Sequence, residues 1–169
     1  MFTTAQNEEF ANLIEENKGI VYKVANAYCK NLDDRKDLVQ EIVIQLWQSF
    51  GRYDRQYKLS TWMYRIALNV SISFYRKEKR RRDSDLPVGE GLIEIAEEDS
   101  LNELEANIIL LQQFINELNE LDKALILLYL EEKGQKEIAE ILGLTESNVS
   151  TKVGRIKEKL KQRFSLTSE

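Results

Sequence analysis

Residues 134–155 read GQKEIAEILGLTESNVSTKVGR, and this stretch decides the fold of the C-terminal part of the chain. Ala139 is small where two helices can cross closely, and Gly143, four residues later, can take the left-handed conformation that ends a helix. Thr145 can then cap a second helix. The spacing therefore predicts a helix-turn-helix. Its two helices would pack together through Ile138, Leu142, Leu144, Val149 and Val153.

The second of these helices would present polar and basic side chains to its surroundings. Asn can read adenine edges, Ser and Thr bond to several base edges, and Lys and Arg contact phosphate or guanine. A helical hairpin with no role in DNA binding is the alternative interpretation of the same spacing. The candidate DNA-binding residues are Ser147, Asn148, Ser150, Thr151, Lys152 and Arg155.

Helical periodicity continues through nearly all of the remaining chain, and no β-hairpin signal interrupts it. We expect two helices before residue 29, separated at Gly19. A third helix would have its cap at Asp33 or Asp34, and a fourth, capped by Ser60, would extend into a basic stretch. The N-terminal half of the chain is therefore expected to form a small helical bundle.

The segment that follows residue 99 also has helical patterns. Ser100-Leu-Asn-Glu103 is a capping-box sequence, in which the Ser side chain and the Glu side chain satisfy each other's backbone amides. The apolar residues after it recur every three or four positions, which predicts a core-facing seam rather than a coiled coil. Further helices are expected over about 122–131, 135–142 and 145–164, so the fold class is all-α. The seam consists of Leu101, Leu104, Ile108, Leu111, Ile115 and Leu118.

The composition excludes most catalytic chemistry. The 169 residues contain no histidine and one cysteine, Cys29, which removes His-based acid–base catalysis, disulfide frameworks and nearly all transition-metal sites. No apolar run approaches the ~20 residues of a membrane span, and the N-terminal residues lack a signal-sequence pattern. We expect a cytoplasmic protein that works by binding, is not an enzyme, does not insert into membranes and needs no metal or cofactor.

The net charge of −5 is unevenly distributed along the chain. Residues 1–83 hold 15 basic and 11 acidic side chains, residues 84–132 hold 1 and 13, and residues 133–169 hold 8 and 5. The single proline, Pro87, and two of the seven glycines fall in the acidic part, where they disfavour a continued helix. The pattern predicts two small helical domains, 1–82 and 100–169, joined by a flexible acidic linker, 83–99.

Acidic residues mark one face of the helix expected after residue 33. Asp33, Asp37 and Glu41 are spaced i, i+4, i+8, which aligns their carboxylates. Paired carboxylates can serve acid–base chemistry or a divalent metal, but no accompanying nucleophile, histidine or phosphate loop supports that use. A protein-docking face and a plain solvated face remain the two interpretations.

Aromatic and basic residues alternate from Tyr53 to Arg82. Basic groups can follow a phosphate backbone while aromatic faces stack on unpaired bases. Asn69 lies in a helical setting from which it could read a base edge. Part of the pattern has another explanation, because four residues recur every fourth position and are expected in the core: Trp62, Ile66, Val70 and Phe74.

Three motifs in this order resemble a known family. They are DDRKDLVQE at 33–41, STWMYRIALN at 60–69 and the helix-turn-helix at 134–155. The chain is similar to bacterial sigma factors, and with two domains and a short linker it resembles the extracytoplasmic-function (ECF) group. The resemblance implies a transcription initiation factor that binds core RNA polymerase, directs it to specific promoters and helps open the DNA. Residues 1–82 would then be the region 2 domain and residues 100–169 the region 4 domain.

The resemblance also implies roles for particular residues. The first domain would dock on the largest polymerase subunit through Asp33, Asp37, Gln40 and Glu41. It would capture the melted minus-ten element through Tyr53, Tyr57, Lys58, Asn69, Arg76, Lys77 and Arg80. The helix-turn-helix would read the minus-thirty-five element through the six residues given above. The implied partners are core RNA polymerase, through its largest and second-largest subunits, promoter DNA and an inhibitory anti-sigma factor.

The chain departs from the family pattern at a few positions. Many members carry Arg where this chain has Leu68 and Asp where it has Ser73, and both positions lie near the minus-ten reading helix. Two other functions fit parts of the sequence: a helix-turn-helix regulator that binds duplex DNA without polymerase, and a helical adaptor that binds only proteins. The first leaves the acidic face and the aromatic stretch unexplained, and the second leaves the helix-turn-helix unexplained.

Overall fold

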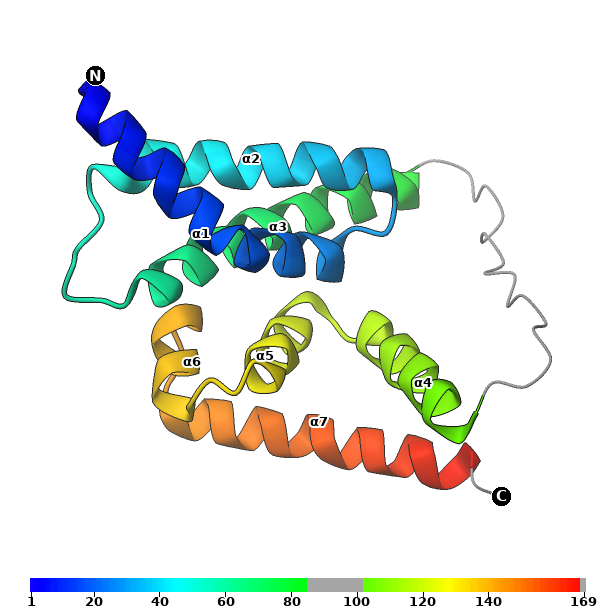
Figure 1. Ribbon diagram of the computed structural model, residues 1–169. Coiled ribbons are helices and arrows are strands. Elements are labelled where there is room, and N and C mark those ends of the chain that lie inside the picture. Colours follow the sequence, from blue (N-terminus) through cyan, green and yellow to red (C-terminus); the bar gives the residue numbers. More distant parts are fainter. Residues whose placement is uncertain (85–101, 168–169) are drawn as a thin grey trace.

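The computed structural model describes residues 1–84 and 102–167, and these residues form seven helices and no β-strand. The all-α prediction is therefore confirmed. Three helices form a first bundle and four form a second one, which lie one above the other in Figure 1. The first bundle comprises α1 (Thr4–Tyr28), α2 (Leu32–Phe50) and α3 (Leu59–Ser84). The second comprises α4 (Glu103–Glu117), α5 (Glu120–Leu130), α6 (Gln135–Leu142) and α7 (Glu146–Thr167).

The first helix is longer than predicted. α1 runs without interruption through Gly19, where two helices were expected. A mid-helix glycine costs about 1 kcal/mol relative to alanine, which is too little to end a helix whose flanking turns pack on a core. Here Val21 and Val24 are fully buried, and they lie directly after the glycine. Tertiary packing thus outweighs the local preference.

The helix caps in the first half differ from the prediction at two points. α3 begins at Leu59, so Ser60 lies within that helix and does not cap it. Asn31, rather than Asp33 or Asp34, caps α2: its Oδ1 accepts hydrogen bonds from the backbone amides of both aspartates, at 2.9 and 3.2 Å. The two aspartates occupy the first turn, where their negative charge interacts favourably with the positive end of the helix dipole. Leu38, which lies about 140° around the helix from the exposed Asp33, is fully buried. This arrangement fixes which side of α2 faces outward.

The helix-turn-helix prediction matches the geometry of α6 and α7. Gly143 has φ 69° and ψ 35°, the left-handed conformation that ends α6. Thr145 Oγ1 accepts a hydrogen bond from the Asn148 amide at 3.1 Å and so caps α7. α6 packs against α7, Ile138 and Val149 are fully buried, and Ala139 is buried as well.

The apolar seam on α4 is only partly core. Leu118 is buried and Leu111 and Ile115 are half-buried, but Leu104 and Ile108, in the first half of the helix, are exposed. The buried residue of α4 itself is Phe114, which the predicted seam did not include. The expectation that the whole seam lies in the core is therefore wrong for its N-terminal half. The predicted cap is also replaced: Asn102 caps α4, accepting from the Glu105 amide at 2.8 Å. Ser100, Leu101 and most of the predicted linker lie outside the described residues.

The two bundles pack against each other, with α3 against α5 and α6, and α1 against α5. The Tyr28 hydroxyl, at the end of α1, donates a hydrogen bond to the Glu120 carbonyl oxygen at 2.6 Å. The Arg76 guanidinium pairs with the Glu120 carboxylate, and Lys23 pairs with Glu131, each at 2.8 Å. Over residues 1–84 and 102–167, none of the helices has the length and apolar character that a bilayer span requires.

Candidate functional site

One face of α2 carries the acidic motif. Asp33, Asp37, Gln40 and Glu41 are all exposed, while Leu38, Ile42 and Leu46 on the other side are fully buried. A spacing of three and four residues places the exposed group in a single stripe. Sequence reasoning missed one member of that stripe, Ile44, an apolar side chain that is 52% exposed. The signal was available, because Ile44 follows Glu41 by three and Asp37 by seven. The predicted docking residues are thus brought together on a surface with charged and apolar parts.

The loop between α2 and α3 forms a pocket with the first turns of α3. The Tyr53 ring lies against the Trp62 ring, with centroids 4.8 Å apart, and the Tyr53 hydroxyl donates to the Tyr57 carbonyl oxygen at 2.8 Å. The Asp54 carboxylate accepts from the Gln56 amide at 3.0 Å and tightens the turn. The cavity has a volume of about 190 Å³, and Arg65 contributes to its lining. Two predicted minus-ten residues, Tyr53 and Tyr57, therefore line one cavity.

The second bundle approaches this pocket from α6. Glu140, which the sequence does not connect with residues 53–62, contributes to its lining. The neighbouring Glu137 accepts a hydrogen bond from Thr61 Oγ1 at 3.2 Å and lies 3.5 Å from Lys133 Nζ. Lys133 in turn stands over the Tyr64 ring, 5.6 Å from its centroid. Carboxylates of α6 therefore occupy the flank of the helix that carries the predicted minus-ten residues.

The remaining minus-ten candidates project from α3. Asn69, Lys77 and Arg80 are exposed, and Lys58, just before the helix, is exposed as well. Arg76 is different, because its guanidinium is engaged by Glu120 of α5. That pairing also lowers the pKa of the Glu120 carboxyl, mainly through the hydrogen bond from Arg76. The four apolar residues assigned to the core on this helix pack partly buried against it, as predicted: Trp62, Ile66, Val70 and Phe74.

The start of α7 presents the predicted minus-thirty-five residues outward. Five of the six are exposed, and Lys152 is half-buried. Val149, Val153 and Ile156 hold the opposite face against the rest of the bundle. Arg155 forms no ion pair with any residue that the structure describes, so its guanidinium is available to a ligand. The five exposed residues are Ser147, Asn148, Ser150, Thr151 and Arg155.

No cluster of carboxylate or thiol side chains able to hold a metal ion occurs in the described ranges, 1–84 and 102–167. The arrangement consists instead of three surfaces: the exposed stripe of α2, the aromatic pocket before α3 with the α3 stripe, and the polar face of α7. Each of them is rich in charged or aromatic side chains that can contact a macromolecule. The geometry therefore supports binding.

Comparison with known proteins identifies the two bundles. The family model for sigma-70 region 2 matches residues 13–81, and the model for sigma-70 region 4 matches residues 108–160. The RNA polymerase sigma factor SigV of Bacillus subtilis is 31% identical over 157 residues, covering 92% of this chain and 90% of that protein. The ECF RNA polymerase sigma factor SigW of the same organism is 27% identical over 167 residues, covering 93% and 89%.

Two solved structures share the fold. The sigma factor RpoE from Bartonella quintana, in complex with the anti-sigma factor NepR, matches with a TM-score of 0.67 at 20% identity, covering 96% of this chain and 98% of that one. CnrH, in complex with the cytosolic domain of CnrY, gives a TM-score of 0.67 at 18% identity, with 95% and 90% covered. The chain therefore belongs to the extracytoplasmic-function group of sigma factors, the transcription initiation factors that bind RNA polymerase and direct it to promoters.

Proposed function

We propose that the exposed stripe of α2 docks on the largest subunit of core RNA polymerase. Asp37, Gln40 and Glu41 supply charge and hydrogen-bonding groups, and Ile44 adds apolar area in the same stripe. Charged groups at an interface set orientation and association rate, whereas buried apolar area supplies affinity. Because the α2 stripe combines both kinds of group, the docking interpretation is favoured over that of a plain solvated face.

The aromatic pocket before α3 is proposed to capture an extruded base of the melted minus-ten strand. Tyr53, Tyr57 and Trp62 provide stacking surfaces, and Arg65 places positive charge at the wall. Proteins that hold unpaired nucleotides combine aromatic faces with a basic groove in this way. Lys58, Asn69, Arg76, Lys77 and Arg80 would then follow the strand along α3. This pocket is the single observation that carries the assignment of the first bundle to promoter opening.

The polar face of α7 is proposed to read the minus-thirty-five element in the major groove. The N-terminal residues of a recognition helix contact base edges there, and Arg155, one turn further on, can reach guanine or phosphate. The predicted set, Ser147, Asn148, Ser150, Thr151, Lys152 and Arg155, lies on one accessible surface apart from the half-buried Lys152.

We further propose the division into a region 2 domain, 1–82, a linker, 83–99, and a region 4 domain, 100–169. The protein would perform no covalent chemistry, since polymerisation belongs to the core enzyme, and it would act in the cytoplasm. The two structural neighbours are complexes with the anti-sigma factors NepR and CnrY, which supports the proposal that an anti-sigma factor also inhibits this protein.

Run-off transcription on a promoter library with purified core polymerase tests these assignments. The wild-type protein is expected to give promoter-dependent transcripts, and Tyr57→Ala is expected to reduce them at least about fivefold, since base stacking is worth about 1–3 kcal/mol. Tyr22→Ala is the matched control, because Tyr22 is also half-exposed but lies on α1. Equal transcription by the two variants would refute the pocket assignment.

A further inference from the structure

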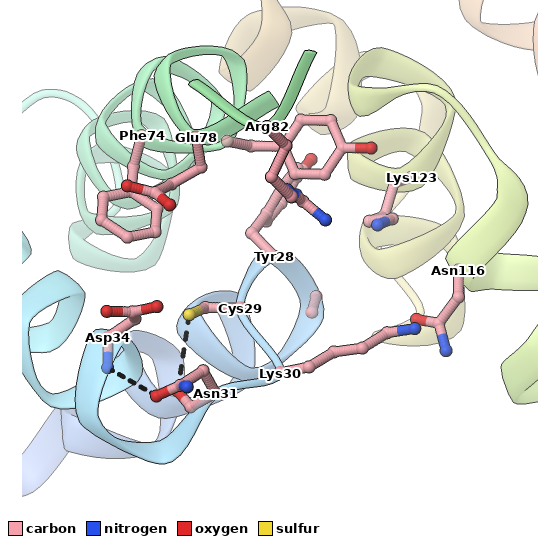
Figure 2. A pocket seen from close by; sticks show the side chains of 12 residues that line it. Tyr28, Cys29, Lys30, Asn31, Asp34, Phe74, Glu78, Arg82, Asn116 and Lys123 are labelled. Atoms are coloured by element: carbon pink, nitrogen blue, oxygen red, sulfur yellow. Dashed lines mark hydrogen bonds between the residues drawn. The ribbon is translucent and has the colours of Figure 1, made fainter. Parts of the chain in front are cut away.

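A second cavity lies between the two bundles, away from the aromatic pocket. Its volume is about 380 Å³, which falls within the range of small-molecule sites. The first bundle contributes the junction of α1 and α2 and one side of α3, and the second contributes Asn116 and Lys123 (Figure 2). Nothing in the proposed contacts with polymerase or promoter uses this cavity.

Lys123 is the unusual residue of this cavity. The residue is 4% exposed, yet its ammonium forms no ion pair with a carboxylate anywhere in the described part of the chain. It stands over the rings of Tyr28 and Tyr75, 5.4 and 5.1 Å from their centroids. The nearby Glu120 is engaged by Arg76. Contacts with aromatic rings offset only part of the desolvation cost of a buried ammonium group, because that cost is large without a counter-charge.

The cavity is lined by three cations, Lys30, Arg82 and Lys123, and by two carboxylates, Asp34 and Glu78, and the two lysines lie at the opposite end from the carboxylates. Burial lowers the pKa of Lys123, and the positive charge of Lys30 lowers it further. The two ammonium groups are therefore close enough to repel each other and lie at the same end of the cavity. At the other end, burial and the carboxylate of Asp34 raise the pKa of the Cys29 thiol, with a smaller contribution from Glu78. Figure 2 shows the same separation: Asp34 and Glu78 lie beside Cys29, while Lys30 extends toward Asn116 on the side of Lys123.

We propose that this cavity binds a small anionic molecule whose carboxylate or phosphate group lies between Lys123 and Lys30. The Asn116 amide can donate to the same group, and the Asp34 and Glu78 end suits a hydrogen-bond donor or a cationic group of the ligand. The ligand would touch both bundles. It would therefore stabilise their packed arrangement, because a ligand favours the state that it binds more tightly. The site makes this sigma factor responsive to a metabolite without any partner protein.

The test uses the full chain and two probes, inorganic phosphate and malonate, at an ionic strength held constant with sodium chloride. Thermal unfolding at increasing probe concentration gives a dissociation constant. At least one probe is expected to raise the unfolding temperature saturably, and the one that does so distinguishes a phosphate site from a carboxylate site. Lys123→Met, which keeps an unbranched apolar stem beside the two rings, should weaken that binding at least tenfold. The control is Lys136→Met, since Lys136 is exposed on α6.

Two results would overturn the proposal. One is a wild-type unfolding temperature that neither phosphate nor malonate raises above its value in sodium chloride at the same ionic strength. The other is an unchanged dissociation constant in Lys123→Met, which would place the anion elsewhere, for example on the basic surfaces proposed for DNA. If Lys123→Met fails to fold, Lys30→Gln takes its place, because Lys30 is exposed and its loss leaves the interior intact. At least threefold weaker binding in that variant supports the site, and unchanged binding refutes it.

Discussion

The hydroxyl of Tyr28 offers a direct test of how the two bundles are held together. The residue is 5% exposed, and its hydroxyl donates to the Glu120 carbonyl oxygen at 2.6 Å, across the boundary between α1 and α5. Burial, followed by the charge of Glu120, raises the pKa of the phenol, so the group stays protonated and able to donate at neutral pH. Tyr28→Phe removes this hydrogen bond alone. The phenyl ring still fills the space and still faces Lys123, since any aromatic ring can accept a cation.

The expected loss is about 1–2 kcal/mol. A buried hydrogen bond contributes about 0.5–1.5 kcal/mol net, and a carbonyl left without its partner adds a desolvation penalty. The Arg76–Glu120 ion pair at the same boundary is worth less, at most about 1 kcal/mol, because the Arg76 side chain is 59% exposed. A loss of 1–2 kcal/mol corresponds to a shift of roughly 5- to 30-fold in the equilibrium between packed and separated bundles.

Energy transfer between probes on α2 and α7 measures this equilibrium in the full chain. Tyr28→Phe is expected to increase the ratio of separated to packed molecules by that factor. Tyr22→Phe is the matched control, because Tyr22 lies on the same helix, is 50% exposed and makes no hydrogen bond within the described residues. The same energy-transfer distribution for both variants would show that the Tyr28 contact does not hold the bundles together.

Three further predictions concern the proposed interfaces and the pH dependence of stability. Lys substitution of Asp37 and Glu41 should weaken binding to core polymerase in a pull-down by at least tenfold, whereas Glu16→Lys on α1 should not. Arg155→Ala should weaken minus-thirty-five binding by about 1–3 kcal/mol, selectively for one base if it reads a base edge and uniformly if it contacts phosphate; competition between promoter variants separates the two results, and no loss would remove it from the site. Burial raises the pKa of Tyr64 to about 12, above its unfolded value near 10, so its contribution to stability is complete below pH 10 and is lost as the pH rises toward 12; urea unfolding at pH 9 and 11 should show this loss, and equal free energies would contradict it.

Helix ends could be predicted from local sequence where a residue type strongly favours one backbone conformation. Gly143 ends α6 in the left-handed conformation, which few other residues adopt, and the predicted bounds of that helix agree with the structure. Caps were less predictable, because Asn31, Asp33 and Asp34 can all accept backbone hydrogen bonds. Which of them caps α2 depends on where the chain leaves α1, and that is set by the packing of Tyr28. The break expected at Gly19 failed for a related reason, since buried residues after it hold the helix together.

The candidate site divides in the same way. The α2 stripe follows from helical spacing alone, and the sequence pattern was sufficient to place its acidic members on one exposed face. The wall that Glu140 adds to the aromatic pocket was not predictable, since it joins segments some 80 positions apart. Lys123 was equally hidden, because its near-complete burial arises only where α5 meets α1 and α3. Contacts between bundles depend on tertiary geometry, for which the sequence carries no periodic signal.

The acidic excess of residues 84–132 has a structural consequence at this boundary. Glu120 from that segment pairs with Arg76, and Glu137 and Glu140 of the adjoining α6 lie at Thr61 and at the aromatic pocket. Carboxylates of the second bundle therefore stand where phosphates of the promoter strand are proposed to lie. The Arg76 Nε–H donates to Glu120, and the remaining N–H groups of the guanidinium can still donate to a phosphate, so Glu120 and the promoter strand would share the charge of Arg76. Added salt would weaken both the attraction of these basic groups to the carboxylates and their attraction to phosphate. If the proposed minus-ten roles hold, carboxylates of the second bundle would compete with DNA for the basic surface of α3, although the net charge of the whole chain is −5.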